Sequence, residues 1–271
     1  MVELNIKNFD IEKICYSGQC FRMNKEEDGC FSVIAGSRYL KIQDVDGSYH
    51  FECSKQSFED FWKHYFDLDR DYDQIATRIS KEDSYLLEAA AYGYGIRILN
   101  QDLWEMILSF LISQNNNITR IRKCIDLVCR RYGKEEKTED GQIYYGIPHP
   151  EILAELSDED LKACNLGYRS KYIIRTSKMI QTGGINLDDI KKMDYAHAKQ
   201  ELLKCYGIGE KVADCICLFG LHHLNAFPVD THIKKVLDLH YKAGFPMQRY
   251  EDICGVLQQY IFYYDVHPLN I

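Results

Sequence analysis

The chain has 271 residues, of which 46% are hydrophobic and 27% charged, an ordinary composition for a globular protein that buries a substantial core. The formal net charge of -8 argues against nucleic-acid binding by the surface as a whole, so any contact with phosphates must come from local clusters of Lys and Arg. No apolar run is long enough to span a membrane, and eleven cysteines scattered through a chain without an evident secretory signal favour reduced thiols.

Residues 1–80 are predicted to form a small antiparallel sheet with one helix. The expected strands are short, partly alternating segments separated by turns at glycine: Phe21–Met23, Phe31–Ala35, Arg38–Asp44 and Tyr49–Cys53, with turns at Gly29, Gly36 and Gly47. The helix is indicated by Phe58, Phe61, Trp62 and Tyr65, which recur at helical spacing. From residue 81 to 271 we expect a second, mostly helical region.

Within the first region, Gly18 lies in the segment Ser17-Gly18-Gln19-Cys20-Phe21-Arg22. A glycine there lets a ligand approach the backbone closely. An ordinary turn before a strand explains the same residues, and the residues alone favour that interpretation.

The helical region is predicted to begin with a buried helix over residues 101–113. It ends at Gln114, followed by three asparagines, which cap helices in the left-handed conformation. A second helix over 118–132 follows at once. Asparagines at such a corner suit contacts with base edges, although a capped loop is the simpler explanation. Two clusters of cations lie nearby: Arg120, Arg122, Lys123, Arg130 and Arg131, then Arg169, Lys171 and Arg175.

Two further segments are predicted between these helices and the C-terminal part. Residues 134–150 are charged and contain glycine and proline, so we expect a surface loop. Residues 157–160, Ser-Asp-Glu-Asp, are typical of the first turn of a helix.

The stretch 202–239 carries the features that most directly suggest chemistry. Gly207 and Gly209 allow a sharp turn that leaves the first N–H groups of the next helix uncovered, which makes a site for a phosphate. Lys211 and Cys215 are four residues apart and share one face of that helix. The positive end of the helix dipole and partial burial both favour the neutral, nucleophilic form of a first-turn lysine amine.

A carboxylate follows nineteen residues after Lys211. Pro228 stops any earlier helix, and Asp230 is placed to cap a helix over 231–239. A glycine turn, a first-turn lysine and a capping aspartate are each common alone, but their occurrence in this order is much more specific.

This order resembles the helix-hairpin-helix and Gly/Pro…Asp motif of DNA glycosylases, and GIGEKVADCICL…PVDTH is most similar to the 8-oxoguanine DNA glycosylase/lyase branch. The resemblance extends from Ser17 to Phe262. It implies an α+β fold, in which a small antiparallel sheet domain of the TBP-like type precedes two mostly helical subdomains with the active site in the cleft between them.

The resemblance implies a role for each residue of the active site. Lys211 forms a Schiff base with the sugar, and Asp230 assists. The carbonyl of Gly18 accepts the hydrogen that 8-oxoguanine carries at N7. Cys215 and Phe262 lie on opposite faces of the base, whose guanine edge is read by Gln258. The neighbouring Gln259 leaves a one-residue ambiguity, in which the spacing to Phe262 favours Gln258.

The resemblance also implies how the DNA is held. Asn115 fills the space of the flipped base, Tyr168 is a wedge in the base stack, and Arg120 and Arg169 read the opposite cytosine. Gly207, Gly209 and His232 are expected to contact phosphates.

No cofactor is expected. Related glycosylases carry four clustered cysteines after the catalytic aspartate, whereas only Cys254 follows Asp230 here, so no iron–sulfur cluster is expected at that place. The carbonyls of the hairpin turn can hold a structural monovalent or divalent cation. We expect a monomer that binds duplex DNA containing 8-oxoguanine, has no membrane span, and resides in the cytoplasm, on the nucleoid if the protein is bacterial.

The function that follows is excision of 8-oxoguanine opposite cytosine, with cleavage of the strand through the Lys211 imine. A glycosylase of relaxed or alkylated-base specificity is one alternative, although the monofunctional relatives lack the lysine. A non-catalytic helix-hairpin-helix protein that only binds DNA is the other, and it leaves Lys211, Asp230, Gln258 and Phe262 without a joint explanation.

Overall fold

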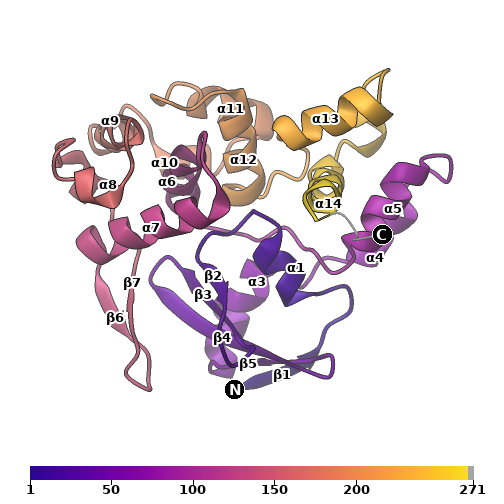
Figure 1. Ribbon diagram of the computed structural model, residues 1–271, viewed down its shortest axis with the longest axis horizontal. Coiled ribbons are helices and arrows are strands. Elements are labelled where there is room, and N and C mark those ends of the chain that lie inside the picture. The colour runs from indigo at the N-terminus through magenta and orange to yellow at the C-terminus, as the bar shows by residue number, and fades with distance from the viewer. Residues whose placement is uncertain (268–271) are drawn as a thin grey trace.

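The computed structural model describes residues 1–267 and contains a five-stranded antiparallel sheet beside a larger group of helices (Figure 1). The strand order is β1-β5-β4-β3-β2. The strands are β1 (Val2–Asn5), β2 (Met23–Lys25), β3 (Phe31–Ala35), β4 (Arg38–Val45) and β5 (Ser48–Phe51). Three of the four predicted strands are therefore confirmed in place or to within a few residues, and the first is displaced.

The sheet buries one face against short helices. Cross-strand neighbours such as Val33 and Leu40, or Ile42 and Phe51, are fully buried, as the alternation of a half-buried sheet requires. They pack with Trp62 in a core of their own. The covering helices are α1 (Ile11–Tyr16) and a continuous segment made of α2 (Lys55–Ser57), a π-helical turn (Phe58–Trp62) and α3 (Lys63–Tyr65).

Three details of the first region differ from the sequence prediction. The strand expected at Phe21–Met23 begins only at Met23, because Phe21 is buried in the core of the helical half. The prediction of a single helix is wrong, since α1 and α4 (Tyr72–Thr77) are also present. The edge strand β1 was not expected, because its four residues are too few for a clear pattern. The clustered buried residues up to Phe66, other than Phe21, belong to the core of the sheet, and those from Tyr72 on, other than Leu99, belong to the core of the helical half. A domain boundary at residue 80 stays a prediction.

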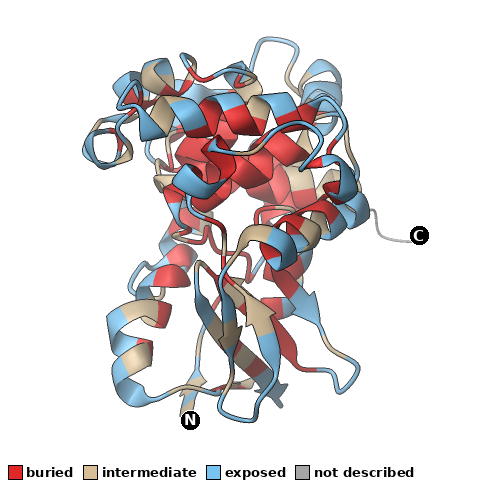
Figure 2. Ribbon diagram, turned by 90° about the vertical axis from the view of Figure 1, so that its left-hand side faces the viewer, coloured by how far each residue is buried: buried red, intermediate tan, exposed pale blue. Residues whose placement is uncertain are grey.

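The helical half is built around α6, in which every residue from Leu103 to Ile112 is buried (Figure 2). Such a helix is apolar on nearly all sides because other helices surround it. The remaining helices are α5 (Ser84–Tyr92), α6 (Leu103–Ser113), α7 (Ile118–Tyr132), α8 (Pro150–Ala154), α9 (Arg169–Gln181), α10 (Leu187–Ile190), α11 (Tyr195–Leu202), α12 (Glu210–Gly220), α13 (Thr231–His240) and α14 (Cys254–Val266), with 3-10 turns at Lys162–Cys164 and Met247–Tyr250.

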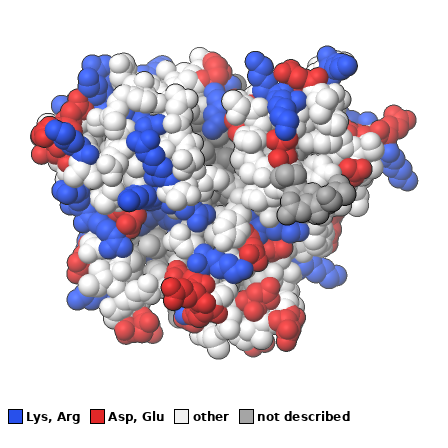
Figure 3. Space-filling view, in the orientation of Figure 1, with Lys and Arg blue, Asp and Glu red and all other residues white. Residues whose placement is uncertain are grey.

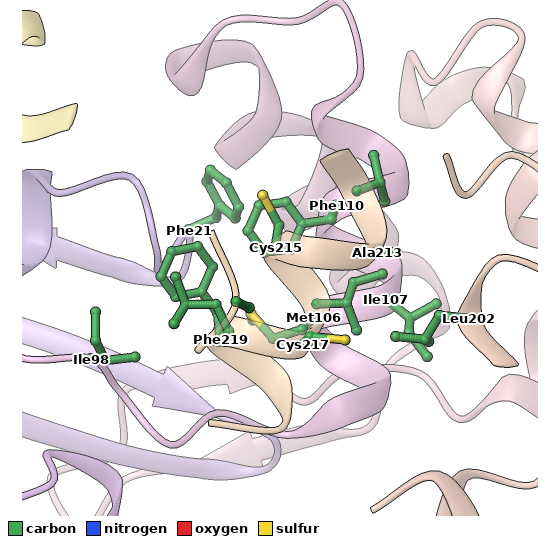
Figure 4. Packing of buried hydrophobic residues seen from close by; sticks show 14 of the residues in the cluster. Phe21, Ile98, Met106, Ile107, Phe110, Leu202, Ala213, Cys215, Cys217 and Phe219 are labelled. Atoms are coloured by element: carbon green, nitrogen blue, oxygen red, sulfur yellow. The ribbon is translucent and has the colours of Figure 1, made fainter. Parts of the chain in front are cut away.

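The contact between α6 and α12 places the predicted catalytic helix in the centre of the molecule. The ring of Phe110 stacks on that of Phe219, with 5.7 Å between centroids, and meets Phe21 at the same distance. Figure 4 shows Phe110 beside Cys215, with Phe21 reaching in from the sheet side. The segment that follows Gly18 in the chain is thus packed against the helix that carries Lys211.

A buried ion pair also joins the two halves. Arg22 Nη1 lies 3.4 Å from Glu105 Oε1, and Glu105 Oε2 accepts a hydrogen bond of 2.7 Å from the backbone N–H of Gly36. Burial raises the pKa of Glu105, and the neighbouring Arg22 opposes that change. The pair holds the sheet against α6. Because Arg22 is four residues after Gly18, it also ties the Gly18 segment to that helix.

Two predictions about the connecting segments are wrong. The loop expected over 134–150 contains a ribbon of β6 (Glu135–Lys137) and β7 (Ile143–Tyr145), whose carbonyl at Tyr145 accepts from Arg22. Its charged composition gave no clear strand pattern, and the ribbon is held by distant partners that include Arg22 and α7. At Ser157, Asp160 Oδ2 accepts a hydrogen bond of 2.8 Å from Ser157 N, but the predicted helix does not form, and only turns and the 3-10 segment follow.

None of the helices in residues 1–267 combines the length and the apolar character that crossing a bilayer takes.

Candidate active site

One small cavity brings together all six residues predicted for catalysis and base recognition. Its volume is about 60 Å³, which is room for a few water molecules, so a larger ligand requires side chains to move. It is lined by Ser17, Gly18, Phe110, Lys211, Cys215, Phe219, Pro228, Asp230, Gln258, Gln259 and Phe262. These residues come from the Gly18 turn, α6, α12, the entry to α13, and α14, so the cavity also involves the first region and not only the helical parts.

The hairpin turn before α12 has the predicted geometry. Gly207 has a φ of +90°, and a Cβ atom there would stand 2.5 Å from the ring of Tyr172, so glycine is required. Gly209 is the N-cap of α12 with an extended backbone and open space where its Cβ would be. The first N–H groups of α12 are therefore accessible to an anion.

Lys211 is the second residue of α12, and its Nζ lies 5.6 Å from the centroid of the Phe110 ring. The aromatic ring forms one wall beside the amine, which limits the water around it. Among the described residues Lys211 makes no ion pair, so its amine is available to a ligand.

Asp230 is the N-cap of α13, as predicted, and its Oδ1 accepts a hydrogen bond of 2.8 Å from the N–H of Ile233. The cap fixes the carboxylate at the cavity while α13 extends away. One carboxylate and one amine therefore line the same cavity from two helix starts.

Cys215 lies one turn after Lys211. Burial raises the pKa of its thiol to about 11, although the neighbouring Lys211 opposes the shift. The thiol is consequently protonated near neutral pH and presents a neutral, polarisable surface to the cavity.

The Gly18 turn is held from several sides. Gly18 has a φ of +78°, and a Cβ atom would lie 3.1 Å from Cε1 of Phe262. The side chain of Gln19 donates to Arg97 O and accepts from Leu99 N, both at 2.8 Å. These bonds fix the backbone of a turn whose carbonyls border the cavity.

Gln258, favoured by its spacing to Phe262, and its neighbour Gln259 both line the cavity, so the choice between them stays a prediction. Gln258 Nε2 donates to Pro228 O at 3.0 Å, and Gln259 Nε2 donates to Ser17 O at 2.9 Å. The Oε1 atom of each amide is buried and has no hydrogen-bond partner in the described chain. Both oxygens are therefore acceptors open to N–H groups of a ligand.

The residues predicted to read the opposite base form a second group. Asn115 has a φ of +46°, which confirms the left-handed cap, and its amide lies 3.3 Å from Tyr168 Oη. Arg120 is exposed and donates to Asn165 O at 3.3 Å. Arg169, also predicted to contact the opposite cytosine, is turned inward in the protein without DNA. It is 4% exposed, and its guanidinium donates to backbone carbonyls, among them Asn115 O at 2.9 Å.

His232 lies near the cavity but is partly engaged within the protein. Its Nδ1 is 2.8 Å from Asp265 Oδ2, and its ring centroid is 5.8 Å from that of Phe262. The side chain is 47% exposed, and its role toward a phosphate stays a prediction.

Sequence reasoning did not assign roles to Phe110 and Gln114. Phe110 lines the cavity, while Gln114 Nε2 donates to Gly207 O at 3.0 Å and so joins the asparagine corner to the hairpin turn. Phe110 was hidden in a uniformly apolar helix. Gln114 preceded the asparagines with no spacing signal of its own. Within residues 1–267 no three His, Cys, Asp or Glu side chains are grouped as a metal site.

Comparison with known protein families gives two matches that together span most of the chain. Residues 1–107 match the N-terminal domain of 8-oxoguanine DNA glycosylase, and residues 108–251 match the HhH-GPD superfamily of base excision DNA repair proteins.

Individual relatives agree with these matches. An N-glycosylase/DNA lyase of Saccharomyces cerevisiae is 37% identical over 55% of this chain, and N-glycosylase/DNA lyase OGG1 of Arabidopsis thaliana is 33% identical over 81% of it. The matched parts span 43% and 63% of those two relatives. The crystal structure of Clostridium acetobutylicum 8-oxoguanine glycosylase/lyase, in complex with dsDNA containing cytosine opposite to 8-oxoG, has a TM-score of 0.90 and 37% identity, covering 96% of this chain and 92% of that one.

Proposed function

The chain belongs to the 8-oxoguanine DNA glycosylase family within the HhH-GPD superfamily of base excision DNA repair proteins, and on that premise we propose that it excises 8-oxoguanine from duplex DNA and then cleaves the strand. The observation that carries the proposal is that the Lys211 amine and the Asp230 carboxylate line one cavity together with Gly18, Cys215 and Phe262. A glycosylase that proceeds through an amine needs such a nucleophile beside a base pocket.

The substrate base must leave the duplex to reach this cavity, which costs a few kcal/mol of stacking and pairing. The base then lies between the ring of Phe262 and the neutral thiol of Cys215. Because the empty cavity is small, Phe262 moves aside as the base enters. Gly18 O accepts the N7 hydrogen that guanine lacks, and Gln258 Oε1 accepts from the N1 and N2 edge.

The chemistry uses Lys211 as a neutral amine. Its Nζ attacks C1′, and the bond from C1′ to N9 breaks with its electron pair leaving on the base, which takes up a proton. Opening of the sugar at the O4′ bond gives an imine between Nζ and C1′, with O4′ protonated. Loss of the C2′ proton then breaks the C3′–O bond, and the 3′ phosphate leaves. Asp230 stabilises the positive charge that develops on the sugar.

The opposite strand is held by the second group of residues. Asn115 occupies the space of the extruded nucleotide and Tyr168 enters the stack, while Arg120 and Arg169 donate to the opposite cytosine. For Arg169 this requires exchanging its present bonds to backbone carbonyls for bonds to the base. Gly207, Gly209 and His232 contact phosphates of the damaged strand.

The remaining parts of the proposal concern accessories and location. The enzyme acts as a monomer and needs no cofactor, and the carbonyls of the hairpin turn are suited to a structural cation. Its place of action is wherever the duplex is, in the cytoplasm or on the nucleoid of a bacterial cell.

Borohydride trapping on a duplex with 8-oxoguanine opposite cytosine tests the proposal. The wild-type protein is expected to form a covalent adduct with the DNA, and Lys211→Gln is expected to form none while still binding the duplex. Lys234→Gln, an exposed lysine on α13, is the control and should trap like wild type. Binding without any adduct, strand cleavage or release of the base would support the non-catalytic alternative and reject the enzyme.

A further inference from the structure

Three tyrosine rings form a continuous row on α9 and the hairpin turn. Tyr168 meets Tyr172 with 5.4 Å between ring centroids, and Tyr172 meets Tyr206 with 5.3 Å, both edge to face. Tyr206 directly precedes Gly207, whose lack of a side chain lets the Tyr172 ring pack against the turn. The row therefore connects the predicted wedge, Tyr168, with the predicted phosphate site.

Arg175 extends this row by one side chain. It lies seven residues after Tyr168 and three after Tyr172, so all three share one face of α9. Its guanidinium carbon lies 4.1 Å from the centroid of the Tyr206 ring, a stacked cation–π geometry. The next residue, Thr176, is fully buried and donates from Oγ1 to Tyr206 O at 3.2 Å, so the backbone under the ring is fixed to the same helix.

The charge of Arg175 is unused within the protein. Arg175 is exposed, and in residues 1–267 it makes neither an ion pair nor a hydrogen bond through its side chain. Tyr206 is 45% exposed, so the guanidinium that lies over its ring is accessible from solution. In a chain of net charge -8, an uncompensated cation held on a ring beside an anion site is a distinctive feature.

The surroundings favour a polyanion as the partner. In Figure 3 Lys and Arg side chains gather over the upper left of the molecule, where Figure 1 places α7 to α9, whereas Asp and Glu gather over the sheet below. A guanidinium that stacks on an aromatic ring keeps its N–H donors free in the plane of the fork, which suits two phosphate oxygens.

We propose that Arg175, stacked on Tyr206, binds a backbone phosphate of the duplex beyond the hairpin turn, so that the DNA contact runs continuously from the wedge to this pair. The proposal rests on the proposed function in that DNA is the ligand. It adds a contact that the hairpin backbone does not supply, because the partner is a side-chain cation rather than a helix N-terminus. Tyr206 is the positioning residue that holds the guanidinium.

The test measures binding to a duplex with a non-cleavable abasic-site analogue and to an undamaged duplex of the same sequence, at salt concentrations between about 50 and 200 mM. For Arg175→Ala the slope of log K against log salt should decrease by about 0.9, and affinity should fall equally for both duplexes, since a phosphate contact carries no base information. Arg175→Lys should keep the slope, because the charge remains.

Two further variants separate charge from geometry. Lys55→Ala removes an exposed cation on the sheet half and should bind like wild type, which controls for the change in net charge. Tyr206→Leu should weaken binding but leave the slope of log K against log salt unchanged. The Arg175 guanidinium is still present in this variant, but the ring no longer holds it in position. An unchanged slope in Arg175→Ala, or a loss confined to the damaged duplex, overturns the proposal.

The inference and the proposed function fail separately. The contact is supported if the wild type binds both duplexes and the slope of log K against log salt decreases in Arg175→Ala. This holds even if the wild type excises no 8-oxoguanine. If the wild type excises 8-oxoguanine but the slope is unchanged in Arg175→Ala, the proposed enzymatic function is supported and the Arg175 contact is not.

Discussion

The ring of Phe262, near the C-terminal end of the described chain, lies so close to Gly18 that a Cβ atom on Gly18 would stand 3.1 Å from its Cε1. The backbone of Gly18 also has a φ of +78°, a conformation that residues other than glycine rarely adopt. Space and conformation therefore both require glycine at this point of the cavity wall.

Gly18→Ala is expected to lower the rate of 8-oxoguanine excision by about tenfold or more, because the methyl group displaces the ring that stacks on the base and strains the turn by roughly 1 kcal/mol. Cleavage of a preformed abasic site should change much less. Gly29→Ala is the matched control, with a φ of +81° and open space around the new methyl group. Equal losses in the two variants would show that backbone strain alone is responsible.

Asp230→Asn separates the two roles of the aspartate. An asparagine still caps α13 by accepting from Ile233 N, so thermal stability should change little, whereas loss of the negative charge should lower excision by about a hundredfold or more. Asp194→Asn makes the same change at the cap of α11 and should leave activity intact. Excision by Asp230→Asn at the wild-type rate would assign this residue a purely structural role.

The two neighbouring glutamines are expected to behave differently when changed to leucine. Gln258→Leu should reduce excision and erase discrimination between 8-oxoguanine and 8-oxohypoxanthine, which lacks the N2 amino group. Gln259→Leu should preserve that discrimination but lower the free energy of unfolding by about 1–3 kcal/mol, because the buried Ser17 carbonyl loses its donor. The reverse pattern would identify Gln259 as the amide that reads the base.

Recognition of the opposite base is expected to depend on Arg120. Excision by the wild type should be fastest opposite cytosine, and Arg120→Ala should reduce the advantage over adenine, guanine and thymine by about tenfold or more, the range for losing a side-chain contact to a base. Arg131→Ala, also exposed on α7, should keep the preference. Wild-type rates that are equal opposite all four bases would contradict this role.

Stability is expected to fall in alkaline solution because the protein buries many thiols. Burial raises their pKa values from 9.0 to about 11 for Cys20, Cys129 and Cys215, and to about 12 for Cys205, Cys217 and Cys254. A raised pKa means that the folded state keeps protons that the unfolded chain releases. The resulting stability is fully present below the unfolded pKa and is lost as pH rises through the folded pKa.

Urea unfolding under reducing conditions at about pH 8 and pH 10 measures this effect. Each thiol contributes up to about 1.4 kcal/mol per pH unit above its unfolded pKa, so the midpoint should be clearly lower at the higher pH. Cys217→Ala removes one such thiol and should flatten the dependence. A midpoint that does not change between the two pH values would show that the buried thiols ionise as freely as in the unfolded chain.

Much of the local structure could be predicted because short stretches of sequence control it. The spacing of apolar residues determined α6, α7 and α12, and Asp230 capped α13 as expected, since helices depend on hydrogen bonds and side-chain periodicity within a few turns. The same stretches identified the amine and the carboxylate. The ribbon β6–β7 was missed because its strands are stabilised by distant partners, including Arg22.

Short stretches of sequence were enough to identify the groups that are able to react, which are Lys211 in the first turn of α12 and Asp230 at the start of α13. The surroundings of these two groups depend on contacts between distant segments. Gly18 meets Phe262, both glutamines face one cavity, and Arg169 turns inward to backbone carbonyls, because side chains from distant segments fill one densely packed interior. The same packing places the Arg175 guanidinium over the ring of Tyr206. The sequence shows Arg175 only as one member of a cluster of cations and does not indicate this contact.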